Sequence, residues 1–197
     1  MTVIDQHPAP PHVKHWTKDE YNTLTEQGVF SGQRLYLFRG ELIEMSPQLH
    51  PHAFAVMQLT AALFRAFGVD QGYKVRIQLP FDVPGDSMPE PDGLVCTAEQ
   101  GARRPHPDRA VLVIEVADSS QEKDREKALE YAAAAIPEYW LVDVRERRVE
   151  LYRHPVTDGS TQLGFRYSSL QLLNPSDSIE LLEKPGVAVA LAQFFHD

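Results

Sequence analysis

The sequence predicts a mixed α+β (α/β) domain with a central sheet flanked by helices. Short strand-like apolar segments occur along the chain, and stretches with helical patterning separate them. A length of 197 residues suits one well-buried domain and is too short for two domains of ordinary size. We therefore expect one domain over residues 15–197, preceded by a flexible lead-in over residues 1–14 that contains several Pro and His residues.

Helices are predicted from capping residues and from apolar periodicity. Thr17 with Glu20, and Ser119 with Glu122, have the spacing of a capping box, in which two side chains satisfy the first free backbone groups of a helix. The predicted helices cover residues 17–28, 52–67, 119–135 and 187–195. The second of these is apolar on most sides, so we expect it to be largely buried.

Strands are predicted where β-branched and aromatic residues form short runs between turn residues. Two pairs of runs flank short polar turns at residues 39–40 and 145–146, which is typical of hairpins. The predicted strands cover residues 34–38, 41–45, 73–79, 91–97, 110–116, 138–144, 148–154, 165–173 and 178–183.

Composition narrows the functional classes. The longest apolar runs fall well short of the roughly eighteen residues that a membrane-spanning helix needs, so we expect no membrane partner. The single cysteine, Cys96, excludes an internal disulfide and a cysteine-cluster zinc site, and a cytoplasmic location is expected. A net charge of −9 argues against a non-specific nucleic-acid coat protein, but it is compatible with a nuclease because acidic residues can be metal ligands.

Glu115 lies inside the apolar run "AVLVIEV", which indicates a strand covered on both faces. An ionised carboxylate there costs several kcal/mol unless a partner compensates it. Three kinds of partner could offset this cost: a basic side chain, a divalent cation, or hydrogen bonds to the neutral acid. Taken alone, Glu115 is most simply a salt-bridged strand residue.

Asp92 opens the preceding strand, and consecutive strands usually pair, so Asp92 and Glu115 are expected at one edge of the sheet. Taken alone, Asp92 in "PDG" is a turn residue. Two adjacent carboxylates repel each other, and a bound cation reverses that repulsion. Glu44 is a candidate third oxygen ligand, and such ligands suit Mg²⁺ or Mn²⁺ rather than zinc.

Lys127 lies on the helix that begins four residues after Glu115, and it shares one helix face with Asp124 and Tyr131. A lysine at this place could orient a metal-bound water or stabilise charge on a phosphoryl oxygen. Its default role is a solvated lysine paired with Asp124 or Glu130. The combination of two acids on consecutive strands with this lysine favours a catalytic site over these structural roles.

Four segments then resemble a known family in order: "HWTKDEYNTL", "GELIEMSPQLHPHAFAVMQL", "EPDGLVC" and "VLVIEVADSSQEKDREKALEYAAAAIPEYWLVDV". They are similar to the Uma-type endonucleases of the PD-(D/E)XK, or restriction-endonuclease-like, superfamily, and the resemblance covers about residues 15–195. It implies a restriction-endonuclease-like fold, Mg²⁺ or Mn²⁺ as cofactor, metal-dependent hydrolysis of phosphodiester bonds, and a nucleic-acid substrate that we expect to be DNA.

The resemblance also implies roles for individual residues. Asp92 and Glu115 match the family's catalytic and metal-binding acids. Ala117 stands where the plain superfamily pattern has its lysine, and Lys127 matches a lysine that has moved to the next helix. Tyr36 occupies a position where many members have a glutamate. Matching positions with a metal-binding or supporting role are Glu44, Asp124, Tyr131 and His52.

The sequence is therefore compatible with three candidate functions. The first is an endonuclease that uses a metal-activated water, with a homodimer expected if it cleaves both strands. The second is a catalytically inactive binding or assembly module that keeps the nuclease fold. The third is a metal-dependent hydrolase of another phosphate ester.

Overall fold

A computed structural model of the chain describes residues 12–68, 72–103 and 106–195. Its centre is a six-stranded sheet. The strands in sheet order are β3 (Tyr73–Arg76), β4 (Gly93–Thr97), β5 (Leu112–Ala117), β6 (Glu138–Asp143), β7 (Arg148–Thr157) and β8 (Phe165–Leu173). Strands β5 and β6 run parallel and the other neighbours run antiparallel. The sheet is thus mixed, and the predicted α+β class is confirmed.

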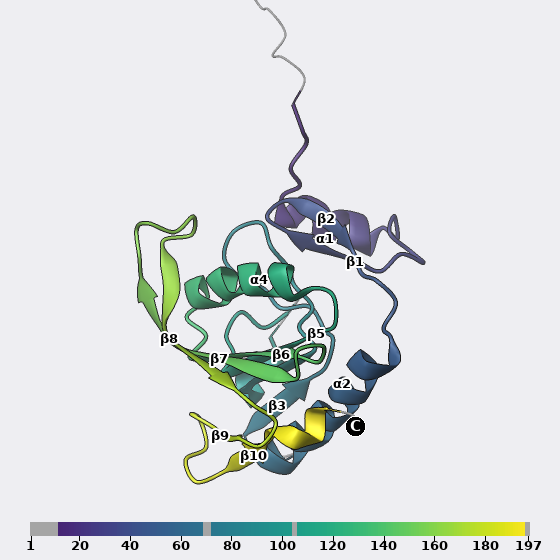
Figure 1. The fold of residues 1–197 in the computed structure, drawn as a ribbon. Helices are drawn as coiled ribbons and strands as arrows, with labels where there is room; N and C mark the ends of the chain where they lie inside the picture. The colour runs from purple at the N-terminus through teal and green to yellow at the C-terminus, as the bar shows by residue number, and fades with distance from the viewer. Residues whose placement is uncertain (1–11, 69–71, 104–105, 196–197) are drawn as a thin grey trace, which may run out of the picture.

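Helices cover both faces of this sheet (Figure 1). Helix α4 (Gln121–Ala133) packs on one face, where the aromatic rings of Tyr131, Tyr139 and Phe81 form part of the core. Helix α2 (His50–Phe67) packs on the other. The same side receives the C-terminal elements, which are β9 (Ser178–Glu180), β10 (Ala188–Ala190) and the 3₁₀ helix η1 (Leu191–Phe194). The short helix α3 (Ala98–Gly101) follows β4 directly, in a segment for which neither a helix nor a strand was predicted.

The N-terminal part forms a separate small unit beside α4 (Figure 1). Helix α1 (Lys18–Glu26) begins with the predicted capping box of Thr17 and Glu20. The hairpin of β1 (Leu35–Phe38) and β2 (Glu41–Glu44) turns at Arg39 and Gly40, whose φ values of 50° and 78° are those that a tight two-residue hairpin turn requires.

Two kinds of contact hold this unit to the core. The Arg39 Nε donates to Glu130 Oε1 on α4 at 2.7 Å, and Glu130 is buried there. The backbone of Leu37 pairs with Met88 in an isolated bridge, and both side chains are buried. The hairpin is therefore fixed against the segment that leads into β4.

The C-terminal helix predicted over residues 187–195 is wrong. Residues 188–190 instead form β10, which pairs with β9, and Val189 is buried between exposed Ala188 and Ala190. This alternation has the period of a strand. Only residues 191–194 are helical, as one 3₁₀ turn, because the segment must bring Leu191 and Phe194 onto α2.

Helix α2 differs from its prediction in a smaller way. It begins at His50 rather than at residue 52, with Pro51 in its first turn, where proline loses no helical hydrogen bond. It was expected to be largely buried, but Met57 and Phe64 are exposed. The buried residues of α2 pack toward the sheet and η1, whereas Met57 and Phe64 face away from this core.

The predicted lead-in of residues 1–14 falls mainly on residues 1–11, which lie outside the described residues. Within residues 12–14, which are described, the Lys14 Nζ donates a hydrogen bond to Glu20 Oε1 at 2.8 Å. In the part of the chain that the structure covers, the helices are too short or too polar to cross a bilayer.

Candidate active site

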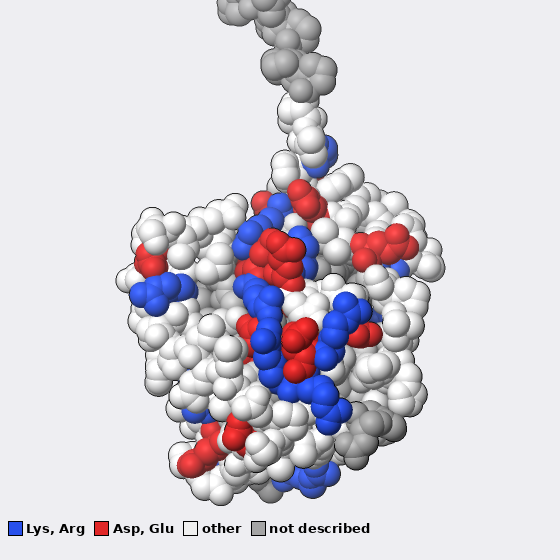
Figure 2. Space-filling model, in the orientation of Figure 1, with Lys and Arg blue, Asp and Glu red and all other residues white. Residues whose placement is uncertain are grey.

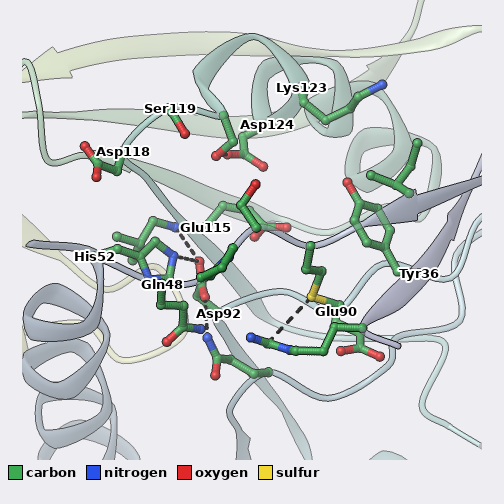
Figure 3. Close-up of a pocket in the computed structure, with 18 of the residues that line it drawn as sticks. Tyr36, Gln48, His52, Glu90, Asp92, Glu115, Asp118, Ser119, Lys123 and Asp124 are labelled. Atoms are coloured by element: carbon green, nitrogen blue, oxygen red, sulfur yellow. Dashed lines mark hydrogen bonds and ion pairs between the residues drawn. The ribbon is translucent and has the colours of Figure 1, made fainter. Parts of the chain in front are cut away.

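Asp92 and Glu115 face one cavity from adjacent strands. Strands β4 and β5 are antiparallel with Gly93 opposite Ile114, so the next step of the same register sets Asp92 opposite Glu115. The two residues keep only 8% and 3% of their surface exposed. Both line a cavity of about 570 Å³ (Figure 3). The two acids lie opposite each other as expected, but not at an edge of the sheet, since β4 and β5 are interior strands.

The Asp92 carboxylate is held by three donors. Its Oδ2 accepts the Val116 backbone N–H at 2.8 Å and lies 3.3 Å from His52 Nε2, and its Oδ1 accepts the Gln78 side-chain amide at 2.9 Å. Gln78 reaches this place because β3 ends at Arg76 and Gln78 takes a left-handed φ of 50°. The strand predicted to continue to residue 79 is thus three residues shorter.

Glu115 receives two donors on the same oxygen. Lys127 Nζ lies 3.0 Å from Glu115 Oε1, and the Tyr131 hydroxyl donates to that atom at 2.6 Å. Burial raises the pKa of Glu115 to about 7, since the Lys127 charge and the Tyr131 hydrogen bond only partly offset burial and the nearby charges of Asp124 and Asp92. Near neutral pH the carboxyl group can therefore be either neutral or ionised.

Lys127 comes from α4 and is bonded to acids on two sides. Besides Glu115, it contacts Asp124 Oδ1 at 2.8 Å, and its Nζ lies 5.2 Å from the centre of the Tyr36 ring. Burial alone would lower the pKa of Lys127, but the charges of Glu115 and Asp124 outweigh burial and hold it well above its usual range. The lysine is therefore a permanent cation at this site.

Asp124 anchors the first turn of α4. Ser120 Oγ donates to Asp124 Oδ2 at 2.5 Å, and the helix N-cap is Ser120, without a side-chain capping bond. The capping box predicted for Ser119 and Glu122 is therefore wrong. The Ser120 hydroxyl bonds a carboxylate instead of the free N–H groups, and this fixes Asp124 beside Lys127.

Ala117 occupies the position where the superfamily pattern has its lysine. Its side chain is fully buried in the α4-side core, where a lysine would displace packed apolar groups. From α4, the Lys127 Nζ reaches Glu115 Oε1 at 3.0 Å.

His52 lies on α2 at the same cavity (Figure 3). Burial lowers its pKa, but the hydrogen bond to Asp92 and the charges of Asp92, Glu115 and Asp124 outweigh burial and raise the pKa overall. Its buried Nδ1 has no hydrogen-bond partner among the described residues. A bound water or ligand in the cavity would satisfy this atom.

Glu44 lines the cavity from β2 and is exposed. Within the described ranges, no group of three or more His, Cys, Asp or Glu side chains stands ready to hold a metal ion. Two carboxylates of adjacent strands nevertheless suit Mg²⁺, which is commonly bound through one or two carboxylates and keeps several waters. The donor set of Asp92 and Glu115 therefore fits a hydrated divalent cation without requiring Glu44 as a direct ligand.

Several lining residues were not singled out from the sequence. Gln78 and Ser120 reach the site only through a left-handed backbone turn and a helix start, which no spacing rule indicates. Glu90, two residues before Asp92 in "PEPD", has a pKa that burial raises and the Arg34 charge partly lowers. Glu90 could have been identified from the sequence, because it belongs to a dense run of acids and prolines before β4.

Comparisons with known proteins identify the family and the fold of the chain. The family model described as "Uma2: Putative restriction endonuclease" matches residues 19–192. No curated protein matches the chain. Among solved structures, the chain is similar to a crystal structure described as a putative nuclease belonging to DUF820 from Anabaena variabilis, with a TM-score of 0.69 and 15% identity. The match covers 90% of this chain and 96% of the other, and at this identity it shows a shared fold.

Proposed function

Because the chain belongs to the Uma2 family, described as putative restriction endonucleases, we propose that it is a nuclease that depends on Mg²⁺ or Mn²⁺. The observation that carries the proposal is the convergence of Asp92, Glu115 and Lys127 from two strands and a helix on one cavity. The expected substrate is a nucleic acid, with DNA as the first candidate. A cytoplasmic location also belongs to this proposal, as does a homodimer if the protein cleaves both strands of a duplex.

Asp92 and Glu115 would hold the divalent cation, and His52 and Gln78 would keep Asp92 in place through its hydrogen bonds. A bound cation would lower the pKa of a water ligand and offset charge on a phosphoryl oxygen. The same positive charge would favour the ionised form of Glu115, whose pKa is otherwise raised to about 7 by burial.

The residues of α4 orient the acids and supply positive charge. Tyr131 and Lys127 both bond Glu115 Oε1, which fixes the rotation of that carboxylate. Asp124 holds the Lys127 ammonium from the other side. An incoming phosphate would meet this ammonium, which can stabilise negative charge that develops on a phosphoryl oxygen. Lys127 would also orient an attacking water.

The test is cleavage of nucleic acid by highly purified protein in Mg²⁺ and in Mn²⁺. Asp92→Asn, Glu115→Gln and Lys127→Ala should each abolish cleavage, since each removes one component of the centre. Glu99→Gln, which changes an exposed acid on α3, is the matched control and should keep full activity. Activity that persists in all three site variants would come from another site or a contaminant and would refute the proposal.

A second candidate is an inactive binding module with the same fold. The observation that favours it is that Lys127 already bonds Glu115 and Asp124, so the buried acids are compensated without a cation. Calorimetric titration with Mg²⁺ and Mn²⁺ separates the two functions. A protein that takes up neither ion at millimolar concentration would be the binding module, whereas uptake that Glu115→Gln removes supports the nuclease.

A further inference from the structure

The cavity has a second wall that the proposed chemistry does not use. It is formed by β2 and by the segment that leads from β2 to α2, and its apolar members are Ile43, Met45, Pro47 and Leu49. Leu49 is 64% exposed and lies at the rim. Apolar side chains contribute little to phosphate binding, so this wall suits a flat, weakly polar group such as a nucleobase.

The reactive centre lies at the base of this cavity rather than on the surface. Lys127, like the two acids, is buried, with 7% of its surface exposed. The exposed lining residues form the rim, and they are Arg34, Glu44, residues 46–49 and residues 119–120. The volume of about 570 Å³ falls in the range of roughly 300–1,000 Å³ that is typical of small-molecule sites. A phosphate held in a duplex stack would stop at the rim, whereas an unstacked nucleotide could enter.

The charges around the cavity also disfavour a duplex. The lining includes three basic residues, Arg34, Lys123 and Lys127. It includes six acidic residues: Glu44, Glu90, Asp92, Glu115, Asp118 and Asp124. A duplex-binding surface needs several Lys or Arg side chains that are free to neutralise phosphates. The excess of acids makes this cavity an unfavourable binding surface for the closely spaced phosphates of a duplex.

Several cations at or next to the cavity are paired with acids, whereas the exposed Arg34 contacts Met45 Sδ at 3.7 Å. On α4, Lys123 pairs with Glu126, and Arg125 with Glu150. Arg39 of the adjacent hairpin pairs with buried Glu130. Figure 2 shows red side chains lying beside and between the blue ones along the middle of this view. Docking a duplex here would require these ion pairs to break.

We propose that the cavity recognises single-stranded nucleic acid by taking up one unstacked nucleotide. The base lies against the apolar wall, with Leu49 and Met45 as specificity-determining residues, and the adjoining phosphate reaches Lys127. This inference rests on the proposed nuclease function and specifies its substrate class. Single-stranded DNA and RNA share the recognised chemistry, so both enter the test.

Binding is measured by fluorescence anisotropy with the full chain and a short labelled oligonucleotide, in Ca²⁺ to limit cleavage. The probes are single-stranded DNA, the same sequence as RNA, and the blunt DNA duplex. We expect either single strand to bind at least about tenfold more tightly than the duplex, because only an unstacked base reaches the wall. Duplex binding that equals single-strand binding overturns the inference.

Rim variants test the wall itself. Leu49→Ser should weaken single-strand binding by about three- to tenfold, since it removes apolar contact with the base. Leu172→Ser is the matched control, because Leu172 is 60% exposed on β8 and does not line the cavity. Equal effects of the two substitutions would assign the binding to general surface properties and overturn the inference.

Cleavage separates this inference from the proposed function. Cutting of the blunt duplex as fast as the single strand in Mg²⁺ would overturn single-strand recognition while leaving the nuclease in place. Binding of single strands that depends on Leu49, without cleavage of any probe in Mg²⁺ or Mn²⁺, would support the recognition and refute the nuclease.

Discussion

Replacing Lys127 with methionine tests the buried charge cluster most sharply. Methionine keeps the length and the apolar stem of lysine but removes the ammonium, which leaves Glu115 and Asp124 without their shared cation. Removing one partner of a buried ion pair costs about 3–5 kcal/mol. Glu115 limits this cost, because its pKa is already about 7 and it takes up a proton easily once the ammonium is gone. We therefore expect a loss of about 3 kcal/mol of unfolding free energy at pH 7, mainly from Asp124.

The loss should depend on pH. The folded-state pKa of Glu115 exceeds its ordinary value of 4.5, so ionising this group lowers stability as the pH rises from about 4.5 to 7. Without Lys127 that pKa moves still higher, and the decline continues to higher pH. The cost of Lys127→Met should thus be larger at pH 8 than at pH 5, where Glu115 is mostly neutral in both proteins.

The assay is urea unfolding followed by the fluorescence of buried Trp140. Lys123→Met is the control, one turn earlier on α4, where the lysine forms a partly exposed pair with Glu126. The control should change stability by less than about 1 kcal/mol. Equal costs for the two substitutions, or a cost of Lys127→Met that does not vary with pH, would refute the reasoning.

Three further predictions concern single side chains. Tyr131→Phe removes the 2.6 Å bond to Glu115, so the pKa of Glu115 should rise above about 7 and Mn²⁺ uptake, measured by calorimetry, should shift to higher pH. Arg125→Gln should cost about 1–2 kcal/mol at pH 7, by urea unfolding, because buried Glu150 loses its bidentate partner. Burial raises the pKa of Glu150, but its bonds to this arginine and to a tyrosine lower it overall, so the cost should disappear as the pH falls below about 4.5. Gly40→Ala should lower the melting temperature, since φ is +78° and the added Cβ would lie 2.9 Å from a side-chain carbon; an unchanged value would contradict the turn geometry.

The parts of the fold that could be predicted are those that depend on local signals. The capping box at Thr17, the hairpin turn at Arg39–Gly40 and the buried strand around Glu115 all follow from residue types within a few positions. The C-terminal segment was mispredicted because "VAVALAQFF" contains both periods. Its partner β9 decided the outcome by offering an edge to Val189 and its neighbours.

The same distinction applies to the candidate site. The pairing of Asp92 with Glu115 followed from strand order, and the helical spacing brought Lys127 together with Asp124 and Tyr131 as expected. The Gln78 amide and the apolar wall could not be predicted in the same way. They reach the cavity through the backbone turn after β3 and through the placement of the separate N-terminal hairpin, which depend on tertiary contacts far apart in the sequence.

The central claim is that Asp92 and Glu115 together bind a divalent cation beside Lys127. A crystal structure of the protein with Mn²⁺, measured at a wavelength where manganese scatters anomalously, tests it directly. The account predicts one anomalous peak in the cavity, within coordination distance of an oxygen from each carboxylate, with Lys127 still bonded to Asp124. A structure at saturating Mn²⁺ with no peak between the two acids, and with Lys127 closing the gap to Glu115, would contradict it.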